Sequence, residues 1–346
     1  MVPITVIPIT VITGFLGSGK TTLISRLLQS PDLADTAVIV NEFGETDLDH
    51  SLIAASSENI LQLMNGCICC TIREDLALEL RNLFHLRALG DVPRFNRVVI
   101  ETTGLADPVP IIHTLMANTE LRKVYRMQAV ITVVDAIVGA RTLADQQVST
   151  RQVALADQLL VSKTDIADVD ADTTELENLR AMLGEINPSA VIVDIQNQSD
   201  SALLSLLLSE NSYPVKGSVA NLEHWLGDMS ASRHDHDHGY GYGHGSGIQT
   251  FTLYREQVIS LADLILFFHE LVNYYPDKLL RVKGLVLIKD KADTPVVVHA
   301  IREKVYPLVW LEGWPSAKRE TQLVFITDGI AREEIEQMLN TVCNAE

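Results

Sequence analysis

The sequence has few cysteines, no excess of basic residues and no apolar run long enough to span a bilayer. Four cysteines occur in 346 residues, and three of them fall between positions 67 and 70, a spacing that favours metal or redox chemistry over a disulfide framework. The net charge of −18 argues against nucleic-acid or anionic-membrane partners, which need a basic surface. The apolar segment Val2–Val11 lacks a basic flank and a small-residue cleavage site. We therefore expect a cytoplasmic protein with no membrane span.

Continuously apolar segments alternate with helical patterns in the first two-thirds of the chain. Such segments indicate parallel strands covered on both faces, and the alternation indicates a doubly wound α/β domain. The predicted strands are Ile4–Thr13, Thr36–Val40, Arg97–Glu101, Ala129–Asp135, Gln158–Ser162 and Ala190–Ile195, and the predicted helices include Thr21–Gln29, Arg73–Leu89, Pro110–Met116 and Thr174–Ile186.

A change of composition predicts a domain boundary. Residues 233–247 are rich in glycine and histidine and have no apolar period, which is typical of a flexible linker. We predict a nucleotide-binding domain over residues 1–212, a linker over 213–247 and a smaller α+β domain over 248–346. The predicted elements of the last domain are strands at Ile248–Tyr254, Leu279–Ile288, Pro295–His299 and Gln322–Thr327 and helices at Ser260–Tyr274 and Ala331–Val342.

A phosphate-binding loop follows the first predicted strand. Residues 14–21 fit the pattern G-x-x-x-x-G-K-[ST], in which backbone N–H groups and a helix N-terminus surround phosphates. Lys20 would meet the β- and γ-phosphates, and the Thr21 hydroxyl would bind Mg²⁺. The alternative is a glycine-rich turn that caps a helix. The predicted nucleotide contacts are Gly14, Gly17, Ser18, Gly19, Lys20, Thr21 and Thr22.

A second candidate loop, Glu101–Gly104, ends another predicted strand. Glu101 would hold Mg²⁺, and the Gly104 N–H would contact the γ-phosphate. Lys20, Thr21 and Glu101 are thus the predicted catalytic residues. No glutamine follows Gly104 to orient a water molecule, so we expect slow intrinsic hydrolysis that a partner, a metal or homodimerisation would raise.

Residues 162–165, Ser-Lys-Thr-Asp, indicate a guanine site. A carboxylate at Asp165 can accept hydrogen bonds from the two N–H groups on one edge of guanine, and the Lys163 stem can cover the ring. Ser162 stands where the similar N-K-x-D motif has asparagine. A surface turn is the alternative. Asn187 is a further candidate for contact with the base.

Three clustered cysteines form the candidate metal site. Cys67, Cys69 and Cys70 form a C-x-C-C motif, and thiolates favour ions such as Zn²⁺ and Cu(I). Three sulfur atoms leave a fourth position open for exchange. Glu42, after the strand Thr36–Val40, could add a carboxylate. The alternatives are buried apolar cysteines and an exposed loop acid.

A histidine-rich segment lies in the predicted linker. The imidazoles alternate with Asp235 and Asp237 and could form a weak metal-collecting arm, or simply a solvated linker. The histidines concerned are His234, His236, His238 and His244.

Together these motifs resemble those of the CobW/YjiA family of P-loop metallochaperone GTPases. The resemblance rests on residues 14–21, 41–44, 67–70, 101–108 and 162–165, in this order, and on Arg281-Val282-Lys283-Gly284 in the last domain. It implies a P-loop NTPase domain with a CobW C-terminal domain, and Mg²⁺-dependent GTP hydrolysis. It also implies delivery of zinc, or of cobalt or iron in some members, to a client metalloprotein. In this resemblance Glu42 and the three cysteines serve the metal.

Other functions remain open at this stage. One is a client-specific activator that inserts cobalt or iron, for example for nitrile hydratase or a cobalamin pathway. A second is a small-molecule kinase that uses the same phosphate loop, against which Asp165 argues. A third is a metal store without turnover. A GTP/ATP competition and a phosphate-release assay would separate the last two from a GTPase.

Overall fold

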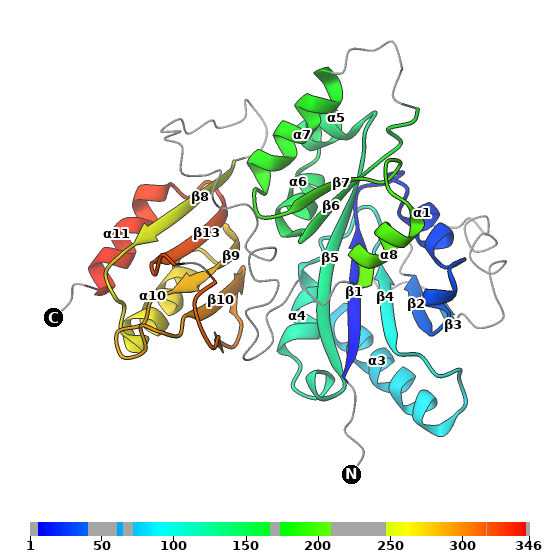
Figure 1. The fold of residues 1–346 in the computed structure, drawn as a ribbon, viewed down its shortest axis with the longest axis horizontal. Helices are drawn as coiled ribbons and strands as arrows, with labels where there is room; N and C mark the ends of the chain where they lie inside the picture. The colour runs from blue at the N-terminus through cyan, green and yellow to red at the C-terminus, as the bar shows by residue number, and fades with distance from the viewer. Residues whose placement is uncertain are drawn as a thin grey trace. The chain divides into compact units, whose positions relative to one another are not determined.

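The computed structural model describes residues 6–40, 61–64, 72–166, 174–208, 247–315 and 317–343. They form two compact units (Figure 1). The first unit comprises residues 1–143, 156–179 and 192–212, and the second comprises 144–155, 180–191 and 213–346. Within the described ranges, no helix is long and apolar enough to cross a membrane.

The first unit contains a seven-stranded sheet in the order β3-β2-β4-β1-β5-β6-β7. Every pairing from β3 to β6 is parallel, which confirms the predicted doubly wound α/β fold. The strands are β1 (Ile7–Thr13), β2 (Thr36–Val40), β3 (Leu61–Met64), β4 (Arg97–Glu101), β5 (Tyr125–Asp135), β6 (Gln158–Ser162) and β7 (Val191–Asp194).

Helices pack on this sheet because its strands are apolar on both faces. One core cluster joins α1 and α8 to β1, β2, β4, β5 and β6, while α4 packs against β5 and against α3. The helices in this part of the chain are α1 (Lys20–Leu27), α3 (Ile72–Leu89), α4 (Val109–Ala117), α5 (Gly139–Asp145), α6 (Gln147–Leu155), α7 (Thr174–Ile186) and α8 (Asp200–Leu208), of which α6 belongs to the second unit.

The order of the strands places the phosphate loop at a switch point. β1 lies between β4 and β5. The strands β2, β3 and β4 lie on one side of β1, and β5, β6 and β7 lie on the other. In such sheets, ligands bind outside the carboxyl ends of the strands where the order reverses. The ends of β1, β4, β5 and β6 therefore converge on one site.

The second unit contains an antiparallel sheet in the order β11-β10-β9-β13-β8, with β12 paired to β10. Helices α10 and α11 cover one face with a common apolar core, as the predicted α+β pattern requires. The elements are β8 (Ile248–Arg255), α10 (Leu261–Tyr274), β9 (Leu279–Val286), β10 (Val296–Ile301), β11 (Lys304–Val305), β12 (Val309–Trp310), β13 (Thr321–Asp328) and α11 (Arg332–Cys343).

The division into units differs from the predicted domain boundaries at α6 and at the end of α7. Arg281 of β9 is buried and donates a hydrogen bond of 2.5 Å to the carbonyl of Leu155, the last residue of α6. Ala154 packs with Leu280 and Ile326 of the sheet. Two segments that precede the predicted linker thus form part of the second unit.

His299 provides a pH-dependent test of the second unit. It is 6% exposed, and burial together with the nearby charges of Arg281 and Lys283 lowers its pKa well below the usual value. The unfolded chain binds this proton near pH 6.5 and the folded chain does not. Stability should therefore fall by about 1.4 kcal/mol per pH unit below about pH 6.5.

Chemical unfolding at pH 7.5 and 5.5 measures this loss. In His299→Gln the loss should be smaller by about the contribution of this one group, even if the variant is less stable at both pH values. Equal losses in the two proteins would contradict the assignment.

Candidate functional site

The phosphate loop turns between β1 and α1 in a conformation that requires glycine. Gly17 and Gly19 have φ values of 73° and 93°, in the left-handed region, and Gly19 is the N-cap residue of α1. A Cβ atom at Gly14 would lie 2.2 Å from the carbonyl oxygen of Val133 on β5. The loop can therefore lie against the end of β5 only with glycine at this position.

Lys20 places its ammonium group at the same loop. Its side chain is 8% exposed, and Nζ donates to the carbonyl oxygens of Gly14 at 3.0 Å and Phe15 at 3.2 Å. The α1 N-terminus carries positive partial charge beside it. This combination of a cation and backbone N–H groups suits phosphate oxygens.

Thr21 and Glu101 lie next to each other. The Thr21 hydroxyl donates a hydrogen bond of 2.6 Å to Oε1 of Glu101, whose side chain at the end of β4 is buried. A hydroxyl and a carboxylate beside a phosphate site are the hard oxygen ligands that Mg²⁺ prefers. The residues present therefore fit the Mg²⁺ site predicted from the sequence.

The loop after β4 touches the phosphate loop. A Cβ atom at Gly104 would lie 2.5 Å from the backbone nitrogen of Leu16. The Thr102 hydroxyl donates to Thr13 Oγ1 at 2.8 Å, which links the ends of β4 and β1. Movement of either loop therefore displaces the other.

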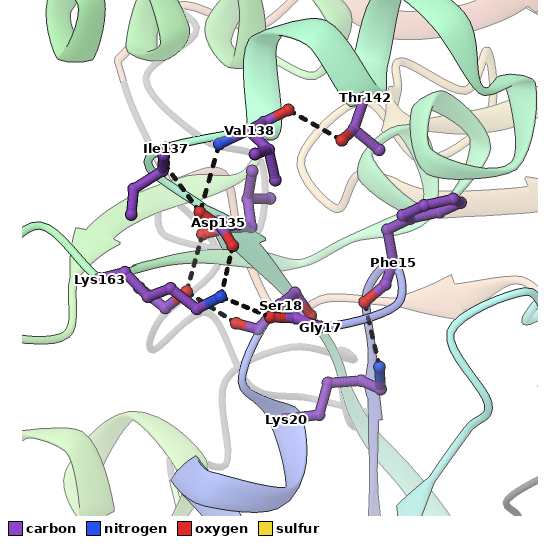
Figure 2. Close-up of polar contacts among 11 residues, drawn as sticks. Phe15, Gly17, Ser18, Lys20, Asp135, Ile137, Val138, Thr142 and Lys163 are labelled. Atoms are coloured by element: carbon purple, nitrogen blue, oxygen red, sulfur yellow. Dashed lines mark hydrogen bonds and ion pairs between the residues drawn. The ribbon is translucent and has the colours of Figure 1, made fainter. Parts of the chain in front are cut away.

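The predicted guanine motif lies at the end of β6 and is joined to the phosphate loop (Figure 2). Ser162 Oγ donates to the Ser18 carbonyl at 2.7 Å, and Lys163 Nζ donates to the Gly17 carbonyl at 2.8 Å. Asp165 is exposed, so its carboxylate can meet a ligand. Ser162 thus holds the phosphate loop even though it is not asparagine.

Family models match both units. The model "CobW/HypB/UreG, nucleotide-binding domain" matches residues 8–194, and "Cobalamin synthesis protein cobW C-terminal domain" matches residues 248–343. The chain belongs to the CobW family.

Relatives in this family include the zinc chaperone YjiA of Escherichia coli K12, which is 30% identical over 329 residues, 95% of this chain and 96% of YjiA. The zinc-regulated GTPase metalloprotein activator 1 of Schizosaccharomyces pombe is 33% identical over 195 residues, 54% of this chain and 45% of that protein. The crystal structure of Zn(II)-bound YjiA GTPase from E. coli matches with a TM-score of 0.71 and 25% identity, covering 97% of this chain and 99% of that chain.

In this CobW protein the Asn187 side chain has protein partners in the second unit, so the structure gives no support to its predicted contact with the base. Its side chain is fully buried in the second unit, and Nδ2 donates to the carbonyls of Val153 and Ala154 at 2.8 and 3.3 Å. It precedes β7, whereas ligands bind beyond the carboxyl ends of strands. Asn187 instead supplies hydrogen bonds to two carbonyl groups near the end of α6.

Two acidic residues at strand ends were missed. Asp135 ends β5 and pairs with Lys163, while Asp194 ends β7 and accepts a hydrogen bond of 2.7 Å from Thr164 Oγ1. Both side chains therefore hold the guanine motif. The signal that identified Glu101, an acid directly after an apolar strand, is also present at these two positions.

The predicted transition-metal ligands lie outside the described residues. This applies to Glu42, the three clustered cysteines and the four linker histidines. Within the described ranges, no group of three or more His, Cys, Asp or Glu side chains is arranged to hold a metal ion. Cys343 lies on α11, where burial raises the pKa of its thiol.

Replacing Ser162 with alanine should weaken nucleotide binding. The change removes the hydrogen bond to the Ser18 carbonyl, which contributes about 0.5–1.5 kcal/mol, so the dissociation constant for GDP should rise by about two- to twelvefold. Titration with a fluorescent GDP derivative measures it. Ser205→Ala, which removes an exposed hydroxyl of α8, is the matched control. Unchanged affinity in Ser162→Ala would contradict the role of this bond.

Proposed function

We propose that the chain is a Mg²⁺-dependent GTPase that binds zinc and delivers it to a client metalloprotein. The observation that carries the nucleotide part is the connection of Ser162 and Lys163 to the phosphate loop. This connection supports the proposal that Asp165, two residues after Lys163, selects guanine beside the phosphate contacts. YjiA, named a zinc chaperone, supports the metal part.

Each residue of the site has a definite task in hydrolysis. Lys20 and the α1 N-terminus would bind the phosphate oxygens and balance their charge. Thr21 and Glu101 would hold Mg²⁺, which supplies further charge neutralisation when bound. Gly104 lets the loop after β4 lie against Leu16, so the loop can respond to the γ-phosphate. Asp165 would select guanine.

The proposed zinc ligands follow strands that end at the same sheet edge. Residues 65–71 follow β3, and Glu42 follows β2. Both strands run parallel to β4, whose end carries Glu101. β3 is three strands from β1 in the sheet, a separation of about 14 Å at a strand spacing near 4.8 Å. We propose that binding of the γ-phosphate changes the affinity of the metal ligands by acting on the segments that follow β2, β3 and β4.

A structure of a relative shapes the test. Zinc is also bound in a YjiA variant in which one glutamate and two cysteines are replaced by alanine. The presence of bound zinc alone would therefore not identify the ligands in this chain. Zinc affinity, measured separately with GDP and with a GTP analogue bound, tests the proposal better than the presence of bound zinc.

Zinc affinity should differ between the GDP state and the state with a non-hydrolysable GTP analogue. A coupling of at least about fivefold is expected, with the same factor for the effect of zinc on nucleotide affinity. Competition with a zinc-binding dye measures it in the full chain. Cys69→Ala should lower zinc affinity and remove the difference, whereas Cys343→Ala, a cysteine outside the motif, should do neither.

Equal zinc affinities in the two nucleotide states would reject the coupling. Phosphate release from GTP, with ATP as competitor, tests the GTPase separately. Turnover with ATP in preference to GTP would point to a kinase, and absence of release under any metal condition would point to a metal store.

A further inference from the structure

Asp135 uses both carboxylate oxygens at the edge of the nucleotide site (Figure 2). Oδ2 pairs with Lys163 Nζ at 2.6 Å, and Oδ1 accepts from the N–H groups of Ile137 at 2.8 Å and Val138 at 3.3 Å. The side chain of Asp135 is 9% exposed. A carboxylate with both oxygens bound has little freedom to move, so it is a fixed anchor.

The backbone brings the two residues together. β5 and β6 pair in parallel with Asp135 opposite Ser162, the residue before Lys163. The N–H of Ala136 donates to the Ser162 carbonyl at 2.9 Å, which extends the pairing past the strand ends. The pair is thus set by the sheet rather than by mobile side chains alone.

Lys163 is held in an unfavourable backbone conformation. Its φ is 60°, in the left-handed region that non-glycine residues seldom adopt. Such a conformation persists where the surroundings over-determine it, and it is common at ligand sites. Here the bonds from Nζ to Asp135 and to the Gly17 carbonyl fix the far end of the side chain.

We infer that Asp135 is a positioning residue for guanine nucleotides: it holds the Lys163 stem in the place where the purine ring binds. The inference rests on the proposed function, because it assigns the ring to Lys163. A lysine side chain loses much rotamer freedom when it is fixed, and Asp135 removes that cost before the ligand arrives. Asp135 therefore affects the binding of the base, through Lys163, and not the reaction at the transferred phosphate.

This role predicts a specific kinetic pattern for Asp135→Asn. Asparagine keeps an oxygen for the N–H groups of Ile137 and Val138 but removes the charge that holds Lys163. The dissociation constants for GDP and for a GTP analogue should rise together, by about tenfold, since both ligands carry the same base. The KM for GTP should rise likewise, while kcat changes less than twofold.

A double-mutant cycle with Lys163→Met separates positioning from a general effect on the fold. Methionine keeps an apolar stem but cannot pair with Asp135, so it should cause a similar loss of affinity. Adding Asp135→Asn to Lys163→Met should then cost little more. Glu120→Gln, which removes the exposed pair with Lys123 in the same unit, is the control and should leave binding unchanged.

The outcomes are distinguishable. A wild-type chain that binds neither GDP nor the GTP analogue would reject the proposed function itself. A wild-type chain that binds them, with unchanged affinity in Asp135→Asn or with the full tenfold loss still present in the Lys163→Met background, would overturn the inference alone. If Asp135→Asn does not fold, Lys163→Met leaves the turn intact, and unchanged affinity in that variant overturns the inference.

Discussion

Close backbone packing around the phosphate loop is the constraint on which the site depends. The loop lies against β5 at Gly14 and against the loop after β4 at Gly104, in both cases too closely for a Cβ atom. Ser162 adds a side-chain bond from β6. Three strand ends are thereby locked to one loop, and protein interiors packed this closely transmit small displacements rather than absorbing them.

Much of this site could be predicted from the sequence because its motifs are local. Residues 14–21 and Glu101 each follow an apolar strand, and strand ends in a parallel sheet meet at one edge. Asn187 does not follow an apolar strand. It precedes β7, and its side chain donates a hydrogen bond to a carbonyl group of α6. Asp135 met the criterion but matched no motif, because its partner is Lys163, far along the chain.

The fold was predicted in outline and missed in its short elements. β3, α5 and α8, which have four, seven and nine residues, were not among the elements predicted from the sequence. The membership of α6 in the second unit depends on the bond from Arg281 to Leu155 and on the packing of Ala154. Contacts between residues more than a hundred positions apart leave no local pattern.

The serine at position 162 links β6 to the phosphate loop. A Cβ atom at Gly19 would lie 3.8 Å from the Ser162 side chain, so β6 and the phosphate loop are nearly in contact at this point. A short hydroxyl spans the remaining distance to the Ser18 carbonyl at 2.7 Å. Ser162 therefore ties β6 to the phosphate loop, while the proposed selection of guanine rests on Asp165 and on Lys163, which pairs with Asp135.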